Sequence, residues 1–446
     1  MTGSREERIA ADFIVNQLAK FKISPVTSDG SYIQNFSLIS PTLDTSSTIY
    51  SSNTQEYTAN RYFFSPSHLI TDTITSFSLY IPEKHLSSTP KFQSPNIILF
   101  SPTFLQINSI LHQTRYHTSL LHSEPFNNIK NLFIVFTDSS HLQLWGKKIH
   151  SYAERLSDDF YIYSNTDSVK HNIIFISYQH ARRLFSSDDF TSILTQYHSY
   201  PHLVTLTHPL YIQNKYRPHL LRTQNILGLI KGTSDSTIII GAHYDHLGTD
   251  AEGNSFNGAD DNASGISALL ALAESLSKQS KPFNKNILFT FWSAEELGLL
   301  GSAYFTDYQP IIPLNKIITY INLDMIGRID TRYQKSENAN YVYVIGSDKI
   351  TTRLDKELNL ANTQSSNMIL DYFYNAETHP MNIYRRSDQY NFLKHNIPTV
   401  FLFRGLHPDY HQITDDFEKI NFDSISNISK LVYQLIINLS TTVKAK

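Results

Sequence analysis

Four apolar segments in the C-terminal half of the chain each run into an acidic residue or a histidine, and this constrains both the fold and its chemistry. They span residues 237–242, 286–292, 317–323 and 399–403. Amphipathic helical patterns separate them, and buried strands that alternate with helices are typical of an α/β fold with a largely parallel sheet. In such sheets the ligand site lies beyond the carboxyl ends of the strands. The sequence therefore predicts that these polar residues meet at one edge of the sheet.

The residues expected at that edge are histidines and carboxylates. The first segment runs into His243 and Asp245, and the second into Glu295 and Glu296. The third runs into Asp324, and the fourth leads through a short loop to His411. Between the first two segments, a turn with Asp260 and Asp261 precedes a helix. Such ligands suit Zn²⁺ or another borderline divalent ion. Five metal ligands drawn from these residues would exceed the three protein ligands of a mononuclear catalytic zinc. The set therefore favours two ions about 3.5–4 Å apart that share a carboxylate.

Each of these residues also has an ordinary structural explanation when it is taken alone. The acidic turn at residues 260–262 could cap the helix that follows, and the glutamates at 295–296 could form a solvated first turn. Asp324 is harder to explain in this way, because an acid that ends an apolar strand must be paired or coordinated. The coincidence of all these residues at strand ends favours a metal site.

Composition excludes several other classes of protein. The 446 residues include 37 Lys and Arg against 40 Asp and Glu, a formal net charge of −3, which indicates neither a nucleic-acid nor an anionic-membrane partner. The chain has no cysteine, which excludes a disulfide scaffold, a thiolate zinc site and a cysteine nucleophile. No apolar run approaches the roughly 18 residues of a membrane span, and the first residues lack a signal-peptide pattern.

Glycine usage and hydrophobic patterning divide the chain into parts. Ten of the 15 glycines lie between residues 225 and 330, whereas Gly146 is the only one between residues 31 and 227. We predict that residues 1–40, which open with a helix capped by Ser4 and Glu7, belong with residues 216–446, and that residues 41–215 form a smaller α/β or β-rich insert. The insert should contain strands at 96–100, 132–136 and 173–176 and a helix at 178–185. In the main part we expect further strands at 225–230 and 340–345 and helices at 265–278, 299–308, 349–358, 388–395 and 423–439.

Five blocks of this sequence resemble the co-catalytic zinc aminopeptidases in their order and character. They are GAHYDHLG at 241–248, NGADDNASG at 257–265, FWSAEELGLLGS at 291–302, INLDMIG at 321–327 and DYHQITDD at 409–416. That group, metallopeptidase family twenty-eight, includes bacterial leucyl aminopeptidases and aminopeptidase Y, with glutamate carboxypeptidase and glutaminyl cyclase as relatives. The resemblance covers about residues 1–40 and 218–446. It implies a zinc-exopeptidase fold of the phosphorylase/hydrolase-like type, a mixed, largely parallel sheet flanked by helices, with a protease-associated-like insert.

The resemblance also implies two Zn²⁺ ions per chain and a ligand set for each. His243 and Asp324 would bind one ion, Glu296 and His411 would bind the other, and Asp261 would bridge the two. A bridging carboxylate at this point agrees with the two-ion site that the residue types favour.

Three further residues match catalytic positions of the group. Glu295 matches the general base, which takes a proton from the attacking water and passes it to the leaving amine. Asp245 matches an acid that orients a ligand histidine. Tyr410 lies where some members have a tyrosine that polarises the scissile carbonyl. The expected activity is therefore that of an aminopeptidase acting on peptides with a free N-terminus, because a substrate amine could lie against the metal or a nearby acid.

Other functions on the same scaffold stay open. Glutaminyl cyclase works with a single zinc ion and lacks the first histidine, so His243 and Asp261 argue against it. A carboxypeptidase for acidic C-terminal residues would need an arginine cluster near the metals, and four arginines lie close in sequence to the site blocks: Arg328, Arg385, Arg386 and Arg404. Non-catalytic relatives lose ligands that this chain keeps. The resemblance also implies export to the periplasm or beyond, although the sequence leaves a cytoplasmic location open.

Two nearby residues are given simpler roles. His246 is expected to support the site or the fold rather than to bind metal. Asp388 opens a predicted helix and is most simply the acid at its N-terminus.

Overall fold

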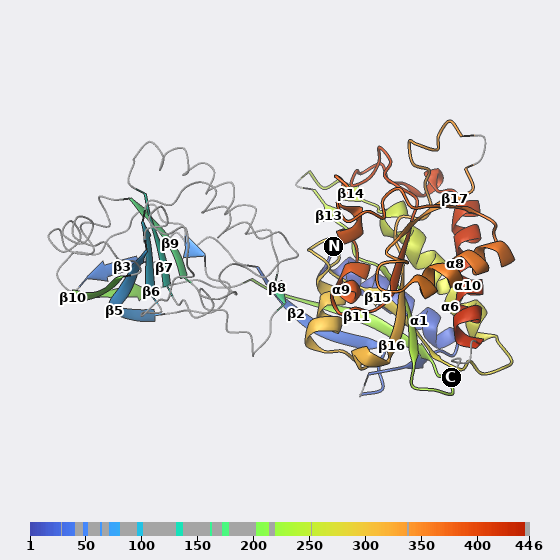
Figure 1. Cartoon of the computed structure of the whole chain (residues 1–446), viewed down its shortest axis with the longest axis horizontal. Helices are drawn as coiled ribbons and strands as arrows, with labels where there is room; N and C mark the ends of the chain where they lie inside the picture. Colours follow the sequence, from blue (N-terminus) through green and yellow to red (C-terminus); the bar gives the residue numbers. More distant parts are fainter. Residues whose placement is uncertain are drawn as a thin grey trace. The chain divides into compact units, whose positions relative to one another are not determined.

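The computed structural model describes residues 1–27, 29–40, 219–250, 252–336 and 339–441, and the strands alone between residues 41 and 218. The chain divides into two compact units, Met1–Ser37 with Leu221–Lys446, and Leu38–Leu220 (Figure 1). The predicted domain limits at 40/41 and 215/216 stay a prediction, because a compact unit is not in itself a functional domain. Among the described helices, none is long and apolar enough to cross a membrane.

A mixed sheet forms the centre of the first unit. Its strands, in spatial order, are β18 (Ile369–Asp371), β17 (Tyr341–Ile345), β19 (Thr399–Phe403), β16 (Ile317–Leu323), β12 (Thr237–His243), β15 (Asn286–Trp292), β11 (His219–Ile230) and β2 (Ile33–Ser40), with β1 (Ser24–Pro25) beside β11. The central strands β19, β16, β12 and β15 are parallel, whereas β17 and β11 flank them antiparallel. The predicted mixed, largely parallel sheet flanked by helices is confirmed.

Alternation along the strands assigns apolar side chains to two helical layers. Ile238 and Ile240 of β12 pack with residues of α1 (Arg5–Lys20), α6 (Gly265–Ser277), α8 (Thr352–Gln364) and α10 (Phe422–Thr441). Ile239, between them, packs on the opposite face with Trp292 and with Phe392 of α9 (Gln389–Lys394). All seven residues of β12 are buried. Because both faces of the sheet are covered, the central strands are continuous apolar runs.

Most predicted elements of the first unit are present with small shifts of their ends. Strands β15, β16 and β19 have the predicted bounds. The helix expected at 349–358 begins later, because Thr351 caps α8 by accepting the Arg353 N–H at 3.3 Å. The helix expected at 299–308 consists of α7 (Leu300–Ala303) and the π-helical turn Tyr304–Tyr308. The short strands β1, β13 (Gly248–Thr249), β14 (Ser255–Phe256) and β18 were not predicted, since two or three residues carry no recognisable period.

The second unit has a sheet of its own. Its order is β3 (Thr48–Ser51), β10 (His202–Gln213), β5 (Thr71–Tyr80), β6 (Asn96–Phe100), β7 (Asn131–Phe136), β9 (Asn172–Ser177) and β4 (Phe63–Phe64). The three predicted strands are β6, β7 and β9, which lie side by side in parallel. The helix predicted at 178–185 falls outside the described residues. Also in this unit, β8 (Tyr161–Ile162) pairs with the end of β2.

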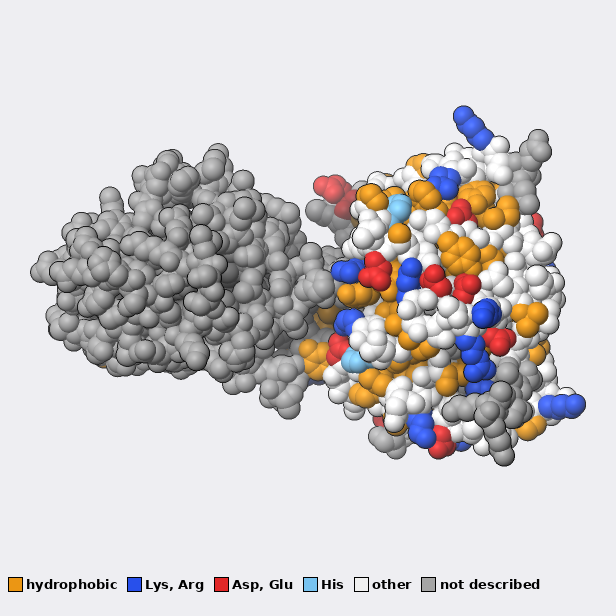
Figure 2. Space-filling view, in the orientation of Figure 1, with side chains coloured by type: hydrophobic (Ala, Val, Ile, Leu, Met, Phe, Trp, Pro, Cys, Tyr) orange, Lys and Arg blue, Asp and Glu red, His pale blue; other side chains and the backbone are white. Residues whose placement is uncertain are grey.

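The surface of the first unit mixes charges of both signs. On the face shown in Figure 2, acidic and basic side chains are interspersed, and neither sign gathers into a patch. A uniformly basic surface, which attracts nucleic acid, is not a feature of this face.

Glu7 joins α1 to the segment that follows β15. The Ser4 hydroxyl accepts the Glu7 N–H at 3.1 Å, as predicted for a capping box. The Glu7 carboxylate does not complete that box. It is buried and accepts hydrogen bonds from the Gly3 N–H at 2.5 Å, from the Thr223 hydroxyl at 2.7 Å and from the Ser293 hydroxyl. A buried carboxylate needs such donors, and here they fix α1 beside a residue two positions before Glu295.

We expect Glu7→Ala to lower the free energy of unfolding by about 2 kcal/mol, because buried donors lose their acceptor. Denaturant unfolding of the two proteins measures the difference. Asp12→Ala is the matched control, since Asp12 is an exposed acid on the same helix and should change stability by less than about 0.5 kcal/mol. Equal losses in the two variants would contradict the role assigned to Glu7.

Candidate metal centre

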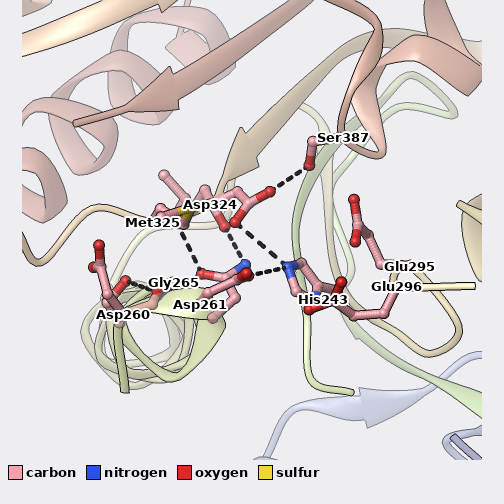
Figure 3. Close-up of polar contacts among 12 residues, drawn as sticks. His243, Asp260, Asp261, Gly265, Glu295, Glu296, Asp324, Met325 and Ser387 are labelled. Carbon is pink, nitrogen blue, oxygen red and sulfur yellow. Dashed lines mark hydrogen bonds and ion pairs between the residues drawn. The ribbon is translucent and has the colours of Figure 1, made fainter. Parts of the chain in front are cut away.

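The carboxyl ends of three parallel strands bring the predicted residues together. In the register of β12 and β15, His243 lies opposite Trp292, and Gly241 of β12 lies opposite Asn322 of β16. The residues that follow these strands, Glu295 with Glu296 and Asp324, therefore start level with His243. Figure 3 shows their side chains around a common space, with Asp261 between them.

Asn262 fixes the acidic turn against the end of β16. Its side-chain amide donates to the Leu323 carbonyl at 3.0 Å and accepts the N–H groups of Gly265 at 3.0 Å and Met325 at 3.3 Å. Gly265 is required there, because a Cβ would lie 2.4 Å from the Leu323 carbonyl oxygen. These contacts bring Asp261 beside Asp324, whereas the Asp260 carboxylate is directed away and accepts the Gly327 N–H at 2.6 Å (Figure 3).

Asp261 presents one carboxylate oxygen to each of two histidines. Its Oδ1 lies 3.1 Å from His243 Nε2, and its Oδ2 lies 3.1 Å from His411 Nε2. His243 Nε2 is also 3.4 Å from Asp324 Oδ1, and His411 Nε2 is 3.2 Å from Glu296 Oε2. The five residues thus form two triads that share Asp261: a first triad with His243 and Asp324, and a second triad with Glu296 and His411.

The distances within the triads, 3.1–3.4 Å between the paired atoms, match those between ligands of one metal ion. Ligand atoms of one tetrahedral zinc ion lie about 3.3 Å apart, because each zinc bond is about 2.0–2.1 Å long. His243 Nε2 and Asp324 Oδ1 are buried and have no hydrogen-bond partner among the residues that the structure describes. Buried polar atoms rarely lack partners, and these two point at each other across a gap that a cation would fill. The residues present therefore fit a zinc ion in the first triad and, by the same distances, in the second.

Excess negative charge at the centre raises the pKa values of Glu295 and His411. Burial, with the nearby Glu296, Asp324 and Asp388 carboxylates, raises the pKa of Glu295 well above its usual value. Burial opposes protonation of His411, but contacts with the Asp261 and Glu296 carboxylates outweigh it and raise its pKa to about 9. A divalent cation would neutralise this charge and would have to displace the proton from His411.

The two adjacent glutamates point in different directions (Figure 3). Glu296 faces the second triad with Oε2, and its Oε1 lies 2.8 Å from His246 Nδ1. Glu295 instead lies on the side of the first triad, where one of its carboxylate oxygens is within 4.8 Å of ligand atoms of His243 and Asp324. It makes no close ion pair with them among the described contacts. Glu296 therefore faces the second triad and Glu295 the first, and their roles as metal ligand and general base stay predictions.

Asp245 contacts both His243 and the glutamate segment. Its backbone carbonyl is the closest partner of His243 Nδ1, at 3.2 Å, while its carboxylate is 3.7 Å from that nitrogen. The carboxylate itself accepts the N–H groups of Glu295 at 3.1 Å and Glu296 at 3.3 Å, and the Thr2 hydroxyl at 3.0 Å. Orientation of a ligand histidine stays the predicted role of Asp245. The structure shows in addition that its carboxylate fixes the backbone of Glu295 and Glu296.

Three residues at the centre have a strained backbone. Ala294, Met325 and His411 have φ values of 57°, 52° and 56°. A positive φ is unfavourable for a residue with a Cβ and costs on the order of 1–3 kcal/mol. These residues precede Glu295, follow Asp324 and carry the second-triad imidazole. Such strain is typical of functional sites, where the surrounding contacts enforce it.

Tyr410 and Arg386 contact each other beside the second triad. The Tyr410 ring stacks on His411 with centroids 3.9 Å apart, and its hydroxyl accepts a hydrogen bond from Arg386 Nη2 at 3.1 Å. Burial raises the pKa of Tyr410, so it remains an O–H donor at neutral pH. The other three arginines are engaged elsewhere: Arg404 with backbone carbonyls, Arg328 with Asp409 and Arg385 with Glu377. In the described part of the chain, no arginine cluster faces the triads.

The two residues given simpler roles lie next to the centre. His246 Nδ1 lies 2.8 Å from Glu296 Oε1, and a ring nitrogen is also within 4.8 Å of ligand atoms of Asp261 and Glu296, so the supporting role of His246 stays a prediction. Asp388 begins α9 but makes no side-chain cap hydrogen bond. It is fully buried, accepts the Ser302 hydroxyl at 2.5 Å and leaves Oδ2 without a partner. Burial raises the pKa of Asp388 to about 7. Asp388 is therefore the acid at the N-terminus of α9, as expected, but its side chain does not cap the helix.

Sequence reasoning missed a chain of buried hydrogen bonds that ends on Asp324. The Ser387 hydroxyl donates to Asp324 Oδ2 at 2.6 Å, and Asn322 donates to Ser387 at 2.8 Å. Behind them, the Tyr320 hydroxyl donates to Asn322 at 2.7 Å and the Trp292 indole donates to Tyr320 at 2.9 Å. The donors all point toward Asp324, which leaves its Oδ1 for a cation. A serine 63 residues away in sequence gives no pattern that would have revealed this.

We expect Ser387→Ala to weaken Zn²⁺ binding by about 10–100-fold, the usual effect of removing an outer partner of a metal ligand. Competition with a chromogenic chelator measures the affinity. Ser347→Ala is the control, because Ser347 is an equally buried serine that donates to Asp355 at 2.7 Å, outside the triads. The expectation fails if Ser387→Ala and Ser347→Ala bind zinc alike.

Comparison with known proteins gives a consistent result for the first unit. The profile of peptidase family M28 matches residues 225–436. Aminopeptidase Y of Saccharomyces cerevisiae is 26% identical over 246 residues, which are 51% of this chain and 41% of that protein. Probable leucine aminopeptidase 2 of Aspergillus oryzae is 29% identical over 186 residues, 41% of this chain and 34% of that protein. The chain therefore spans less than half the length of these curated relatives.

Two solved structures align with the chain over most of its length at low identity. The aminopeptidase from Aneurinibacillus sp. strain AM-1 has a TM-score of 0.47 and 17% identity, over 98% of this chain and 89% of that one. The zinc aminopeptidase BSAP from Bacillus subtilis has a TM-score of 0.48 and 18% identity, over 100% and 92%. Similarities of this size do not distinguish between functions.

Proposed function

Because residues 225–436 belong to peptidase family M28, we propose that this protein is an aminopeptidase that uses two Zn²⁺ ions per chain to remove N-terminal residues from peptides. The observation that carries the proposal is the position of Asp261, whose two oxygens each lie 3.1 Å from a different histidine. Asp261 would bridge two ions in this position, because each of its oxygens faces a different histidine.

Each triad would hold one ion. His243, Asp261 and Asp324 supply three ligands to the first, and Asp261, Glu296 and His411 supply three to the second, which is the number that leaves a catalytic zinc open to solvent and substrate. Zinc bound there would supply Lewis acidity, which lowers the pKa of a water molecule and stabilises negative charge on a substrate oxygen. The His411 side chain is 33% exposed against 10% or less for the others. Substrate would therefore approach from the side of His411.

The remaining residues of the site would handle protons and position the peptide. Glu295 accepts a proton from the attacking water and delivers it to the leaving amine, a transfer for which a raised carboxyl pKa is favourable. Tyr410 donates its hydroxyl hydrogen to the oxygen of the scissile carbonyl. The Arg386 guanidinium, which donates to the same hydroxyl oxygen, makes that phenol a stronger donor. Asp245 holds the Glu295 backbone in place through its N–H.

The charge around the triads favours a free amine as the recognised group. Several buried carboxylates, among them Asp261, Glu295 and Asp324, surround the site. A substrate ammonium group is attracted by this field, whereas an acidic C-terminal residue is repelled. Retention of His243 in contact with Asp261 argues against the single-zinc glutaminyl cyclase alternative.

Two further parts of the proposal rest on the resemblance alone. Residues 41–215 would be a protease-associated-like insert, and the protein would be exported. Fractionation of the native cells tests the second of these, with activity in the exported fraction as the expected result.

Hydrolysis of aminoacyl-p-nitroanilides tests the proposed activity. We expect release of nitroaniline from substrates with a free amino group, none from N-acetylated ones, loss of activity after chelation and recovery on addition of Zn²⁺. Cleavage of blocked substrates, or activity that survives removal of metal, would contradict the proposal. Release of C-terminal glutamate or cyclisation of N-terminal glutamine, with no nitroaniline release, would favour one of the two alternatives.

A further inference from the structure

Asp415 connects the turn that carries Asp261 with the loop that carries His411. It is fully buried and lies four residues after His411. Its Oδ2 accepts the backbone N–H groups of Asp260 at 2.9 Å and Asp261 at 3.1 Å, and its backbone carbonyl accepts the Ala259 N–H at 3.1 Å. Three consecutive amides thus have one residue as their acceptor.

These amides need an acceptor from outside the turn. They lie at the start of the helical segment, where N–H groups have no partner within the helix, and the backbone at Asp261 and Asn262 departs from helical geometry, with φ and ψ of −103° and 86°, and −135° and 41°. Asp415 therefore fixes the backbone of Asp261, whose carboxylate is held toward His243 and His411.

The same carboxylate is anchored on the side of the His411 loop. Asp415 Oδ1 lies 3.7 Å from Arg328 Nη1, and Arg328 Nη2 lies 2.7 Å from Asp409, two residues before His411. A second link between turn and loop is His407, whose Nε2 lies 3.2 Å from Asp260 Oδ2. The loop and the turn are thus linked through charged groups, of which Asp260, His407 and Asp415 are buried.

We propose that Asp415 is a positioning residue for the second triad: it sets the separation of Asp261 from His411 and thereby the affinity of the ion that these residues share with Glu296. The inference rests on the proposed two-zinc function and adds to it a residue that touches neither metal nor substrate. The physical basis is that a carboxylate fixed beneath the amides of Asp260 and Asp261 leaves little freedom for the Asp261 carboxylate, and that removing such outer partners typically weakens metal binding about 10–100-fold.

Zinc titration of three variants of the full chain tests this role. Asp415→Ala removes the side-chain acceptor, and Asp415→Asn keeps an oxygen acceptor without the charge. Asn362→Ala is the matched control, because the buried Asn362 side chain also holds backbone groups, the N–H and the carbonyl of Met368, each at 2.8 Å, but lies on α8. Each variant is titrated in competition with a chromogenic chelator, and its melting temperature is measured without metal.

The expected result is that Asp415→Ala binds the second ion about 10–100-fold more weakly and the first ion with a smaller loss, because Asp415 supports the second triad through both Asp261 and the His411 loop. Asp415→Asn should lie between it and the unmodified protein, because a neutral acceptor makes the weaker hydrogen bond. Asn362→Ala should melt at a lower temperature and keep both affinities. Unchanged binding of the second ion in Asp415→Ala overturns the inference, as does an equal loss in Asn362→Ala. If the unmodified protein binds two ions and cleaves free-amine substrates, either of these two outcomes refutes the role of Asp415 and leaves the proposed function intact. If the unmodified protein binds no zinc, both proposals fail.

Discussion

Glu295→Gln is expected to lower kcat by about 10²–10⁴-fold, the usual contribution of a general base, while both zinc ions stay bound. The substitution preserves the shape of a buried side chain and removes only its ability to accept a proton. In the described part of the chain, Glu295 makes no close ion pair with a histidine, whereas Glu296 Oε2 lies 3.2 Å from His411 Nε2. Steady-state kinetics with an aminoacyl-p-nitroanilide and metal analysis of the same preparation measure the two effects together.

The neighbouring residue supplies the control for this prediction. Glu296→Gln should lose part of its zinc, because a neutral amide is a poor ligand for Zn²⁺ in place of a carboxylate, and its activity should recover in part at high zinc concentration. Activity of Glu295→Gln should not recover in this way. If Glu295→Gln loses zinc and Glu296→Gln keeps it, the two glutamates have been assigned in the wrong order.

Asp261→Ala is expected to abolish zinc-dependent activity and to remove the stabilisation that zinc gives. The unmodified protein should gain about 2.7 kcal/mol of stability when free zinc is 100 times its dissociation constant. The variant should gain far less, since each triad loses a ligand when Asp261 is shortened. Thermal unfolding with and without zinc measures this gain, and the zinc-free proteins show whether the variant still folds.

Asp260 is the natural control for Asp261. It is the adjacent acid, but its carboxylate accepts the Gly327 N–H and faces His407 rather than the triads. Asp260→Asn should therefore still bind two ions, even if it is less stable. Loss of both ions in Asp260→Asn, together with their retention in Asp261→Ala, would show that the first acid of the pair is the bridge.

The strands and the inner residues of the site could be predicted because each follows from a local pattern. The apolar run at residues 317–323 indicates a buried strand, and the parallel sheet brings the acid that follows it, Asp324, to the edge where His243 also lies. The five metal-ligand candidates are brought together in this way. Their assignment as ligands, and that of Glu295, Asp245 and Tyr410 as catalytic residues, remains part of the proposal.

The outer residues of the site could not be predicted, because their partners are distant in sequence. Asp415 and Ser387 contact residues 154 and 63 positions away, through hydrogen bonds that depend on the folded loops. Glu7 was expected to close a capping box, but burial against Ser293 and Thr223 offered its carboxylate better donors. A single polar residue in a loop has no periodicity, so only the three-dimensional arrangement reveals which group it supports.

The most direct test of the two-ion centre is anomalous diffraction at the zinc edge from crystals of the protein grown with Zn²⁺. We expect two peaks of anomalous density about 3.5–4 Å apart, one on each side of the Asp261 carboxylate. One peak should be bounded by His243 and Asp324, and the other by Glu296 and His411. A single peak, or two peaks that do not share Asp261, would contradict this expectation.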